Sequence, residues 1–256
     1  MSIFRVNGGL PGTKRPHLLV FVSYGASSLA LVDLLLDMQA AQRQKNNGMT
    51  GFTFSCVHIA DGRHIDWPWP DVELREVPAP KLDVKLTSRS SQHDISAVLN
   101  RDLARQLAKD ENSVAIMGYS MTKLSELTLA ETVKGRGAAI PRLVAPDVVE
   151  DRMVYPLRDA TLPELVEFVR LQQLLPHVVP DPPVPGITKL QSIDEITRHY
   201  FAAVQQDFPS VVSTVSKVAS RLSQPAEPCG LCQQDDTPVL CYACRSSVGR
   251  ESLDKY

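Results

Sequence analysis

Residues 17–28 read HLLVFVSYGASS and decide the fold. Their first half, residues 17–22, is an unbroken apolar run, which is the pattern of a strand buried on both faces of a parallel sheet. The second half turns through small and polar residues, and residues 29–38 then have helical character. A strand that turns in this way into a helix indicates a Rossmann-like α/β fold.

The alternation of strand and helix continues along the chain. Residues 51–59, 72–77 and 114–117 are further strand candidates, because each is an apolar or β-rich run. Residues 95–108 carry apolar side chains at helical spacing, and residues 121–133 also read as a helix. Strands and helices in this order predict a doubly wound parallel sheet.

The sequence changes character after Pro156. Thr161 and Glu164 have the spacing of a capping box and predict a helix start. Two more helices are expected at residues 193–206 and 211–222.

Two linkers complete the predicted organisation. Residues 176–186 hold five prolines in eleven positions, and residues 224–228 form a second, shorter linker. We therefore expect three parts: an α/β domain over 1–160, a helical region with a proline-rich linker over 161–223, and a cysteine-rich unit over 224–256.

Composition limits the classes of function. The chain has 256 residues, of which 43% are hydrophobic, and a formal net charge of −2. This suits one sizeable core and gives no overall positive field, so RNA would have to meet a local patch. Neither a long apolar run nor the apolar core of a signal peptide is present, and a soluble intracellular protein is expected.

Four cysteines crowd the end of the chain: Cys229, Cys232, Cys241 and Cys244. They form two Cys-x2-Cys pairs separated by eight residues. Each pair can place two thiolates on one tetrahedral metal ion, and four thiolates leave no open coordination position. The pattern predicts a structural zinc knuckle; two disulfides in an oxidising compartment, or free thiols, are the alternatives.

The turn after the first strand consists of Ser23, Tyr24, Gly25, Ala26, Ser27 and Ser28. It resembles the pyrophosphate loop of N-type ATP pyrophosphatases, whose pattern is Ser-Gly-Gly-x-Asp-Ser. Tyr24 stands at the first glycine, where a side chain hinders close backbone approach, and Ser27 stands at the metal-facing aspartate. A plain strand–helix turn capped by Ser27 or Ser28 is the alternative interpretation.

A second motif follows the strand at 114–117 and contains Gly118, Ser120, Thr122 and Lys123. In the catalytic tRNA thiolases that this superfamily includes, the place reads Gly-His-Asn-x-Asp-Asp-x-Ala. Thr122 and Lys123 therefore replace an acidic pair, and a lysine there repels magnesium.

Residues 118–124 are instead similar to Gly-x-Ser-x-Thr-(Arg/Lys)-Leu of the cytoplasmic tRNA 2-thiolation protein 2 family. Four further stretches resemble the same family in the same order: residues 134–138, 155–162, 208–215 and 240–245. The resemblance spans nearly the whole chain. One departure is that no cysteine precedes Cys56, so the family's usual N-terminal cysteine-rich zinc site is not expected here.

The resemblance implies a non-catalytic subunit required for 2-thiolation of the wobble uridine of cytoplasmic tRNAs for Lys, Glu and Gln. It implies a heterodimer with the catalytic thiolase, a paralogue that uses sulfur from the thiocarboxylated ubiquitin-related modifier. ATP is not expected on this chain, and Cys56, alone in the sheet domain, is expected to be a buried inert thiol. An ATP-dependent tRNA-modifying enzyme with an atypical loop and a zinc-containing interaction module unrelated to RNA are the alternatives.

Contacts to RNA are sought among the basic residues near the carboxyl ends of the strands. The candidates are Lys123, Lys134, Arg136, Arg142 and Arg158. Each is a source of phosphate contact, and the alternative for each is an ordinary solvated side chain.

Overall fold

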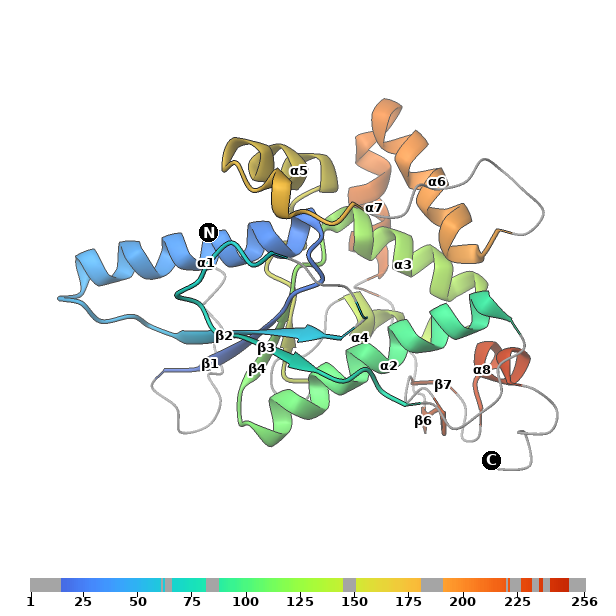
Figure 1. The fold of residues 1–256 in the computed structure, drawn as a ribbon. Coiled ribbons are helices and arrows are strands. Elements are labelled where there is room, and N and C mark those ends of the chain that lie inside the picture. Colours follow the sequence, from blue (N-terminus) through green and yellow to red (C-terminus); the bar gives the residue numbers. More distant parts are fainter. Residues whose placement is uncertain are drawn as a thin grey trace. The chain divides into compact units, whose positions relative to one another are not determined.

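The computed structural model describes residues 15–60, 62, 66–81, 88–144, 151–180, 191–219, 221, 227–231, 235–236 and 240–248. Figure 1 labels the helices and strands along the chain. Contacts divide the chain into two compact units. Unit 1 comprises residues 1–79, 104–121 and 146–182, and unit 2 comprises residues 80–103, 122–145 and 183–256.

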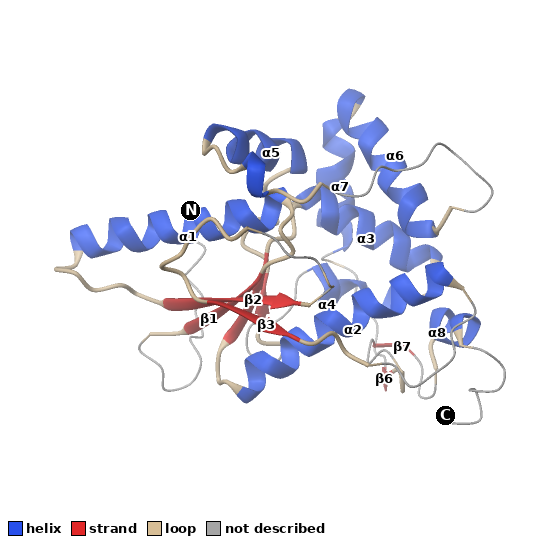
Figure 2. Cartoon of the chain, viewed as in Figure 1, coloured by secondary structure: helices blue, strands red, loops and turns tan. Residues whose placement is uncertain are grey.

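A five-stranded parallel sheet forms the centre of unit 1 (Figure 2). Its strands are β1 (His17–Phe21), β2 (Thr53–Ile59), β3 (Leu74–Val77), β4 (Val114–Met117) and β5 (Met153–Val154). Their order is β3-β2-β1-β4-β5, so the direction of winding reverses between β1 and β4. In such sheets, ligands bind beyond the carboxyl ends of the strands at this switch point.

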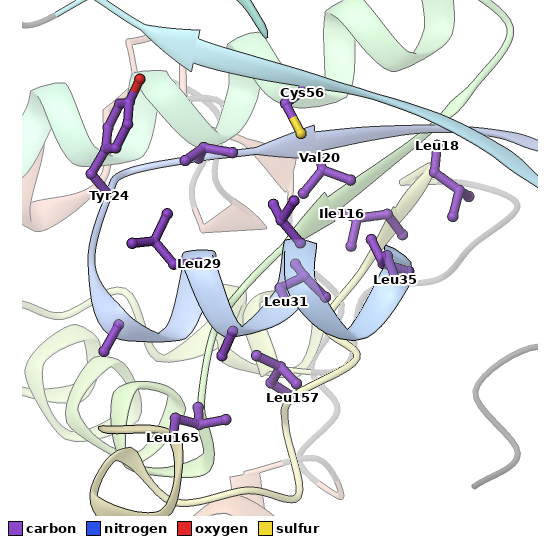
Figure 3. Packing of buried hydrophobic residues seen from close by; sticks show 14 of the residues in the cluster. Leu18, Val20, Tyr24, Leu29, Leu31, Leu35, Cys56, Ile116, Leu157 and Leu165 are labelled. Atoms are coloured by element: carbon purple, nitrogen blue, oxygen red, sulfur yellow. The ribbon is translucent and has the colours of Figure 1, made fainter. Parts of the chain in front are cut away.

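Helix α1 (Ala26–Lys45) is buried from several sides over its first half. Leu29, Leu31 and Leu35 belong to one core cluster, together with Leu157 and Leu165 from the segment that includes α5 (Leu162–Leu171). Figure 3 shows α1 between the strands and these two leucines. A helix that is buried on several sides carries apolar residues on each of those sides. This explains the near-continuous apolar sequence of the first half of α1.

Helix α5 starts as predicted. The backbone N–H and the hydroxyl of Thr161 both donate to Glu164 Oε2, each at 2.7 Å. Helix α5 is followed by the short 3₁₀ turn η2 (Leu175–His177).

Unit 2 is mainly helical. It contains the first part of α2 (Arg89–Asp110), nearly all of α3 (Met121–Val133), η1 (Gly137–Ala139), α4 (Ile140–Val144), α6 (Ile193–Asp207), α7 (Pro209–Ala219), β6 (Glu227–Pro228), β7 (Asp235–Asp236) and α8 (Tyr242–Ser247). Helices α6 and α7 are neighbours, and the Ser125 hydroxyl of α3 donates to the Val212 carbonyl of α7 at 2.8 Å.

The predicted doubly wound parallel sheet with additional helices is confirmed. The strand at 114–117 and the helix at 121–133 have the predicted bounds, whereas α1 extends to Lys45 and β5 was not predicted. The division at residues 160 and 223 stays a prediction. Within the described part of the chain, no helix has both the length and the apolarity that a membrane crossing requires.

Candidate functional site

The loop between β1 and α1 keeps the geometry of a strand–turn–helix. Gly25 is extended and precedes the first turn of α1, where its carbonyl accepts from the N–H groups of Ser28 and Leu29 at 3.0 and 3.2 Å. The Ser28 hydroxyl donates to the same carbonyl at 2.9 Å. This hydroxyl therefore stabilises the turn itself, and Ser23 is the exposed serine of the loop.

Tyr24 has a backbone conformation that glycine adopts more easily than other residues. Its φ of 59° lies in the left-handed region, which costs a residue with a side chain roughly 1–3 kcal/mol. The phenol ring is 3% exposed and meets the rings of His58 and Trp67 edge to face, at centroid distances of 5.0 and 6.0 Å. Packing of this ring offsets the strain and fixes the loop.

The two motifs that follow β1 and β4 touch each other. A Cβ atom at Gly118 would lie 2.7 Å from the Ser27 carbonyl oxygen and 3.0 Å from Ser28 Cα. Only glycine allows this approach, because real Cβ atoms do not come that close to backbone. The structure thus brings the predicted loop and Gly118 together at the switch point of the sheet. Ser120 is buried on the same connection.

Thr122 and Lys123 are engaged within unit 2. The Thr122 hydroxyl donates to Gln205 Oε1 of α6 at 3.1 Å. Lys123 Nζ lies 3.6 Å from Glu126 Oε2, one turn further along α3. Thr122 therefore joins α3 to α6, Lys123 pairs within α3, and neither motif contributes a carboxylate.

Three of the four C-terminal cysteines converge. The sulfur atoms of Cys229, Cys241 and Cys244 all lie within 4.8 Å of one another, and all three residues are buried. The Cys241 N–H donates to Cys229 Sγ at 3.3 Å, and the Cys244 N–H donates to Cys241 Sγ at 3.4 Å. Cys232, the fourth predicted ligand, lies outside the described residues. We call residues 227–248 the cysteine knuckle.

These thiols fit a metal ion. Zinc–sulfur bonds of about 2.3 Å in a tetrahedron separate the sulfur atoms by roughly 3.8 Å, within the spread that this cluster has. Backbone N–H groups directed at sulfur favour the thiolate form that a metal requires. The three sulfurs can therefore hold a metal ion, with Cys232 available by spacing as a fourth ligand.

The cysteine knuckle is seated on α2. Cys229, Cys241 and Cys244 belong to a core cluster that includes Ile95 and Val98 of that helix. Among the described residues of the knuckle this cluster is small, so we expect the thiols to carry much of the constraint on its shape.

Arg136 lies in the interior of unit 2 with 0% exposure. Its Nε donates to Glu131 Oε2, and its Nη2 donates to Asp94 Oδ1 at 2.6 Å. Lys134 Nζ donates to the same Asp94 oxygen at 2.6 Å and to Asp194 Oδ1 at 2.7 Å. We call these five residues the charge clamp; it ties α2, α3 and α6 together around the turn at residues 134–136.

The charge clamp shifts the pKa of two of its members, Asp94 and Arg136. Burial alone would raise the pKa of Asp94, but hydrogen bonds and charge from Arg136 and Lys134 outweigh it and lower the pKa below the ordinary 3.8. Burial alone would lower the pKa of Arg136, but Glu131 and Asp94 raise it, so the guanidinium stays charged.

The expectation of RNA contact is therefore corrected for two residues. Arg136 is inaccessible and Lys134 is buried, because carboxylates far away in the sequence enclose them. Arg142 on α4 is exposed, Arg158 is half-buried, and Lys123 is half-buried beside Glu126. Contact of these three with RNA stays a prediction.

The acidic residues of the charge clamp were not predicted from the sequence. Asp94 and Asp194 lie 40 and 60 positions from Lys134, so no local pattern joins them. The spacing of Glu131 and Lys134, three residues apart where α3 ends, was a local signal.

Comparison with known proteins gives a consistent result. A family model described as cytoplasmic tRNA 2-thiolation protein 2 matches residues 192–239. Proteins of that name are similar over most of the chain. The relative from Sclerotinia sclerotiorum is 33% identical over 85% of this chain and 73% of its own length. The relative from Yarrowia lipolytica is 32% identical over 93% and 69%, and that from Pyrenophora tritici-repentis is 29% identical over 97% and 85%.

A solved structure shares the fold. The U34-tRNA thiolase NcsA from Methanococcus maripaludis, determined with its 4Fe–4S cluster, matches with a TM-score of 0.60. The match covers 91% of this chain and 80% of that chain at 12% sequence identity, which supports a common fold of the pyrophosphatase-loop type.

Proposed function

The chain belongs to the cytoplasmic tRNA 2-thiolation protein 2 family, and from that premise we propose that it is a non-catalytic subunit in 2-thiolation of the wobble uridine of tRNA. One observation carries the non-catalytic part of the proposal. The loop and the Gly118 connection keep the frame of a nucleotide site at the switch point, yet no carboxylate stands in either motif.

The missing carboxylates matter because of the chemistry. Adenylation of a uridine oxygen by ATP needs magnesium, which binds through carboxylates and phosphates. Here Ser27 stands at one such position, and Thr122 and Lys123 are engaged with Gln205 and Glu126. ATP is therefore proposed to act on a partner subunit and not on this chain.

Sulfur handling is also proposed to lie elsewhere. Cys56 is the one cysteine in the sequence of unit 1, it is fully buried, and burial raises its pKa to about 12. A thiol in this state is a poor nucleophile, and a single thiolate cannot hold an iron–sulfur cluster such as that of the related thiolase.

Without carboxylates in the two motifs and without a reactive thiol in unit 1, the chain would need a catalytic partner subunit. We propose a heterodimer with a catalytic thiolase of the same fold, which receives sulfur from a thiocarboxylated ubiquitin-related modifier. The tRNAs for Lys, Glu and Gln are the proposed substrates, and the cytoplasm, named in the relatives' titles, is the proposed location.

Zinc is the metal that we propose for the cysteine knuckle. A closed set of four thiolates suits zinc in a structural role, and the sulfur positions of Cys229, Cys241 and Cys244 support this assignment. When bound, the metal would cross-link the short segments of the knuckle; it would supply no reaction chemistry.

Release of pyrophosphate from ATP tests the proposal that ATP acts on the partner subunit and not on this chain. The purified chain is incubated with ATP, magnesium and tRNA, and its turnover is compared with that of a Lys123→Ala variant. We expect the wild-type chain to release no more pyrophosphate than that variant does. Turnover that exceeds it would support instead an ATP-dependent modifying enzyme with an atypical loop.

A further inference from the structure

Four aromatic side chains gather beside the loop after β1. Tyr24 follows β1, and its ring meets those of His58, near the end of β2, and Trp67 at centroid distances of 5.0 and 6.0 Å. Trp67 in turn meets Trp69 at 5.0 Å. We call these four residues the aromatic cluster. Because β1 and β2 are parallel and end at the same edge of the sheet, the cluster lies at their carboxyl ends.

The ring, and not the backbone, is what a tyrosine adds at this position. A glycine would adopt the φ of 59° without strain, whereas a residue with a side chain bears a cost. The backbone course of the loop therefore does not require a tyrosine. The phenol ring is 3% exposed, so the contribution of Tyr24 lies in filling the aromatic cluster.

A second segment, distant in the sequence, contacts the same residue. The Val179 N–H donates to the Tyr24 carbonyl at 2.8 Å. His177 Nδ1 lies 3.4 Å from Oδ2 of Asp66, the residue directly before Trp67. Two segments thus hold Tyr24 in place, one through its ring and the other through its backbone.

The topology of the sheet gives this position its importance. In a sheet with the order β3-β2-β1-β4-β5, ligands bind beyond the carboxyl ends of the strands, and anions bind at the N-terminus of the helix that follows β1. A nucleotide bound there needs access to the backbone of residues 23–28. Tyr24, Ala26 and Ser28 are each at most 9% exposed, so the chain itself covers these three residues of the loop.

We propose that the aromatic cluster is a plug: the Tyr24 ring occupies space beside the loop that a bound nucleotide would need. The inference deepens the proposed function and rests on it, since both concern the same nucleotide frame. It adds a second barrier to ATP, independent of the missing carboxylates. A Ser27→Asp variant would therefore not bind ATP while the ring is in place.

Binding of magnesium–ATP to the full chain tests the plug. Equilibrium dialysis is applied to wild-type protein and to Ser27→Asp, Tyr24→Gly/Ser27→Asp and Tyr24→Phe/Ser27→Asp variants. Tryptophan fluorescence gives a second readout, because Trp67 and Trp69 are the two tryptophans of the chain and both belong to the aromatic cluster. Circular dichroism and urea unfolding verify that each variant is folded.

Wild type and Ser27→Asp are expected to keep their tryptophan emission unchanged when ATP is added. They should bind ATP at least about tenfold more weakly than Tyr24→Gly/Ser27→Asp, in which no buried ring has to move. Tyr24→Phe/Ser27→Asp is the matched control: it keeps the ring and should behave like Ser27→Asp.

Binding by wild type or by Ser27→Asp that is as tight as binding by Tyr24→Gly/Ser27→Asp would overturn the plug. A folded Tyr24→Gly/Ser27→Asp chain that binds no ATP would also overturn it, because another group would then exclude the nucleotide. If the glycine variant does not fold, wild type and Ser27→Asp still decide, since ATP binding that changes the tryptophan emission of either contradicts the plug. Wild-type protein that binds ATP without releasing pyrophosphate would overturn the plug and leave the proposed non-catalytic function standing.

Discussion

The loop after β1 and the cysteine knuckle both resemble motifs with a known chemical use. The two differ in whether the functional atoms of the motif are present. The loop has the course of a strand–turn–helix, with Tyr24 in the left-handed region and Gly118 in contact with Ser27, but it contains no acidic residue. The knuckle keeps its ligand atoms, three of which converge. The backbone course of a motif therefore does not show that its chemistry is present; the functional side-chain atoms determine the chemistry.

The physical reason is what holds each region in shape. The loop is held by apolar packing, such as the Tyr24 ring against His58 and Trp67, so a carboxylate can be lost without unfolding it. The knuckle rests on a small cluster with Ile95 and Val98, so its cysteines are part of its stability. Variants that remove either the apolar packing of the loop or the thiols of the knuckle test whether the two regions are stabilised in these different ways.

The largest effect is expected from Cys229→Ser. A structural zinc contributes on the order of 10 kcal/mol to the folding of a small zinc module, and one lost thiolate removes much of this. Elemental analysis of wild-type protein should give about one zinc per chain, and the variant should lose it to a mild chelator. Amide exchange in residues 240–248 should rise at the same time.

Cys56→Ser is the matched control for that variant. It places a hydroxyl in the buried strand β2 and is expected to cost about 1–3 kcal/mol, with the zinc content unchanged. A wild-type protein that is metal-free, with reduced thiols and a folded knuckle, would contradict the metal assignment.

Arg136→Leu should have the next largest effect. It leaves Glu131 and Asp94 buried without their guanidinium partner, which costs about 3–5 kcal/mol in urea denaturation. Arg158→Ala removes a half-buried arginine and should cost less than about 1 kcal/mol. Equal stability of the two variants, with RNA binding lost only in Arg136→Leu, would restore the original assignment of Arg136.

Gly118→Ala probes the contact between the two degenerate motifs. The added Cβ meets the Ser27 carbonyl and should destabilise unit 1 by about 1–3 kcal/mol, measured by thermal or urea unfolding. Gly137→Ala is the control, because nothing lies within 4 Å of a Cβ there. A neutral Gly118→Ala would mean that the loops do not approach as described.

Acid should weaken the charge clamp gradually. The pKa of Asp94 is lowered in the folded chain, so its stabilisation is present above the ordinary value of 3.8 and is lost as the pH falls through the lower folded value. Urea midpoints between about pH 6 and about pH 3 should fall less steeply for Asp94→Asn than for wild type. Equal slopes of the urea midpoint against pH for wild type and Asp94→Asn would show that protonation of Asp94 is not coupled to folding.

The sequence predicted those parts of the fold whose signals are local. The strand at 114–117 and the helix at 121–133 were found with their bounds, because the strand is a short unbroken apolar run and the helix follows it in the alternation of strand and helix. Strand β5 has two residues, too few for a periodic signal, and the polar second half of α1 lacks the apolar spacing that marks a helix. The cysteine pairs were found because their spacing is local.

The interior position of Arg136 could not be predicted in the same way. Arginine is usually exposed, and the partner that buries it, Asp94, lies 42 positions away.

The proposed function is tested most directly by the level of 2-thiouridine at the wobble position of tRNA in cells that lack this chain. We expect the modification to disappear, and to return fully with the wild-type chain and with a Ser27→Ala variant, because the loop is proposed to perform no chemistry. Normal thiolation without the chain, or a folded Ser27→Ala chain that fails to restore it, would contradict the claim that this is a required but non-catalytic subunit.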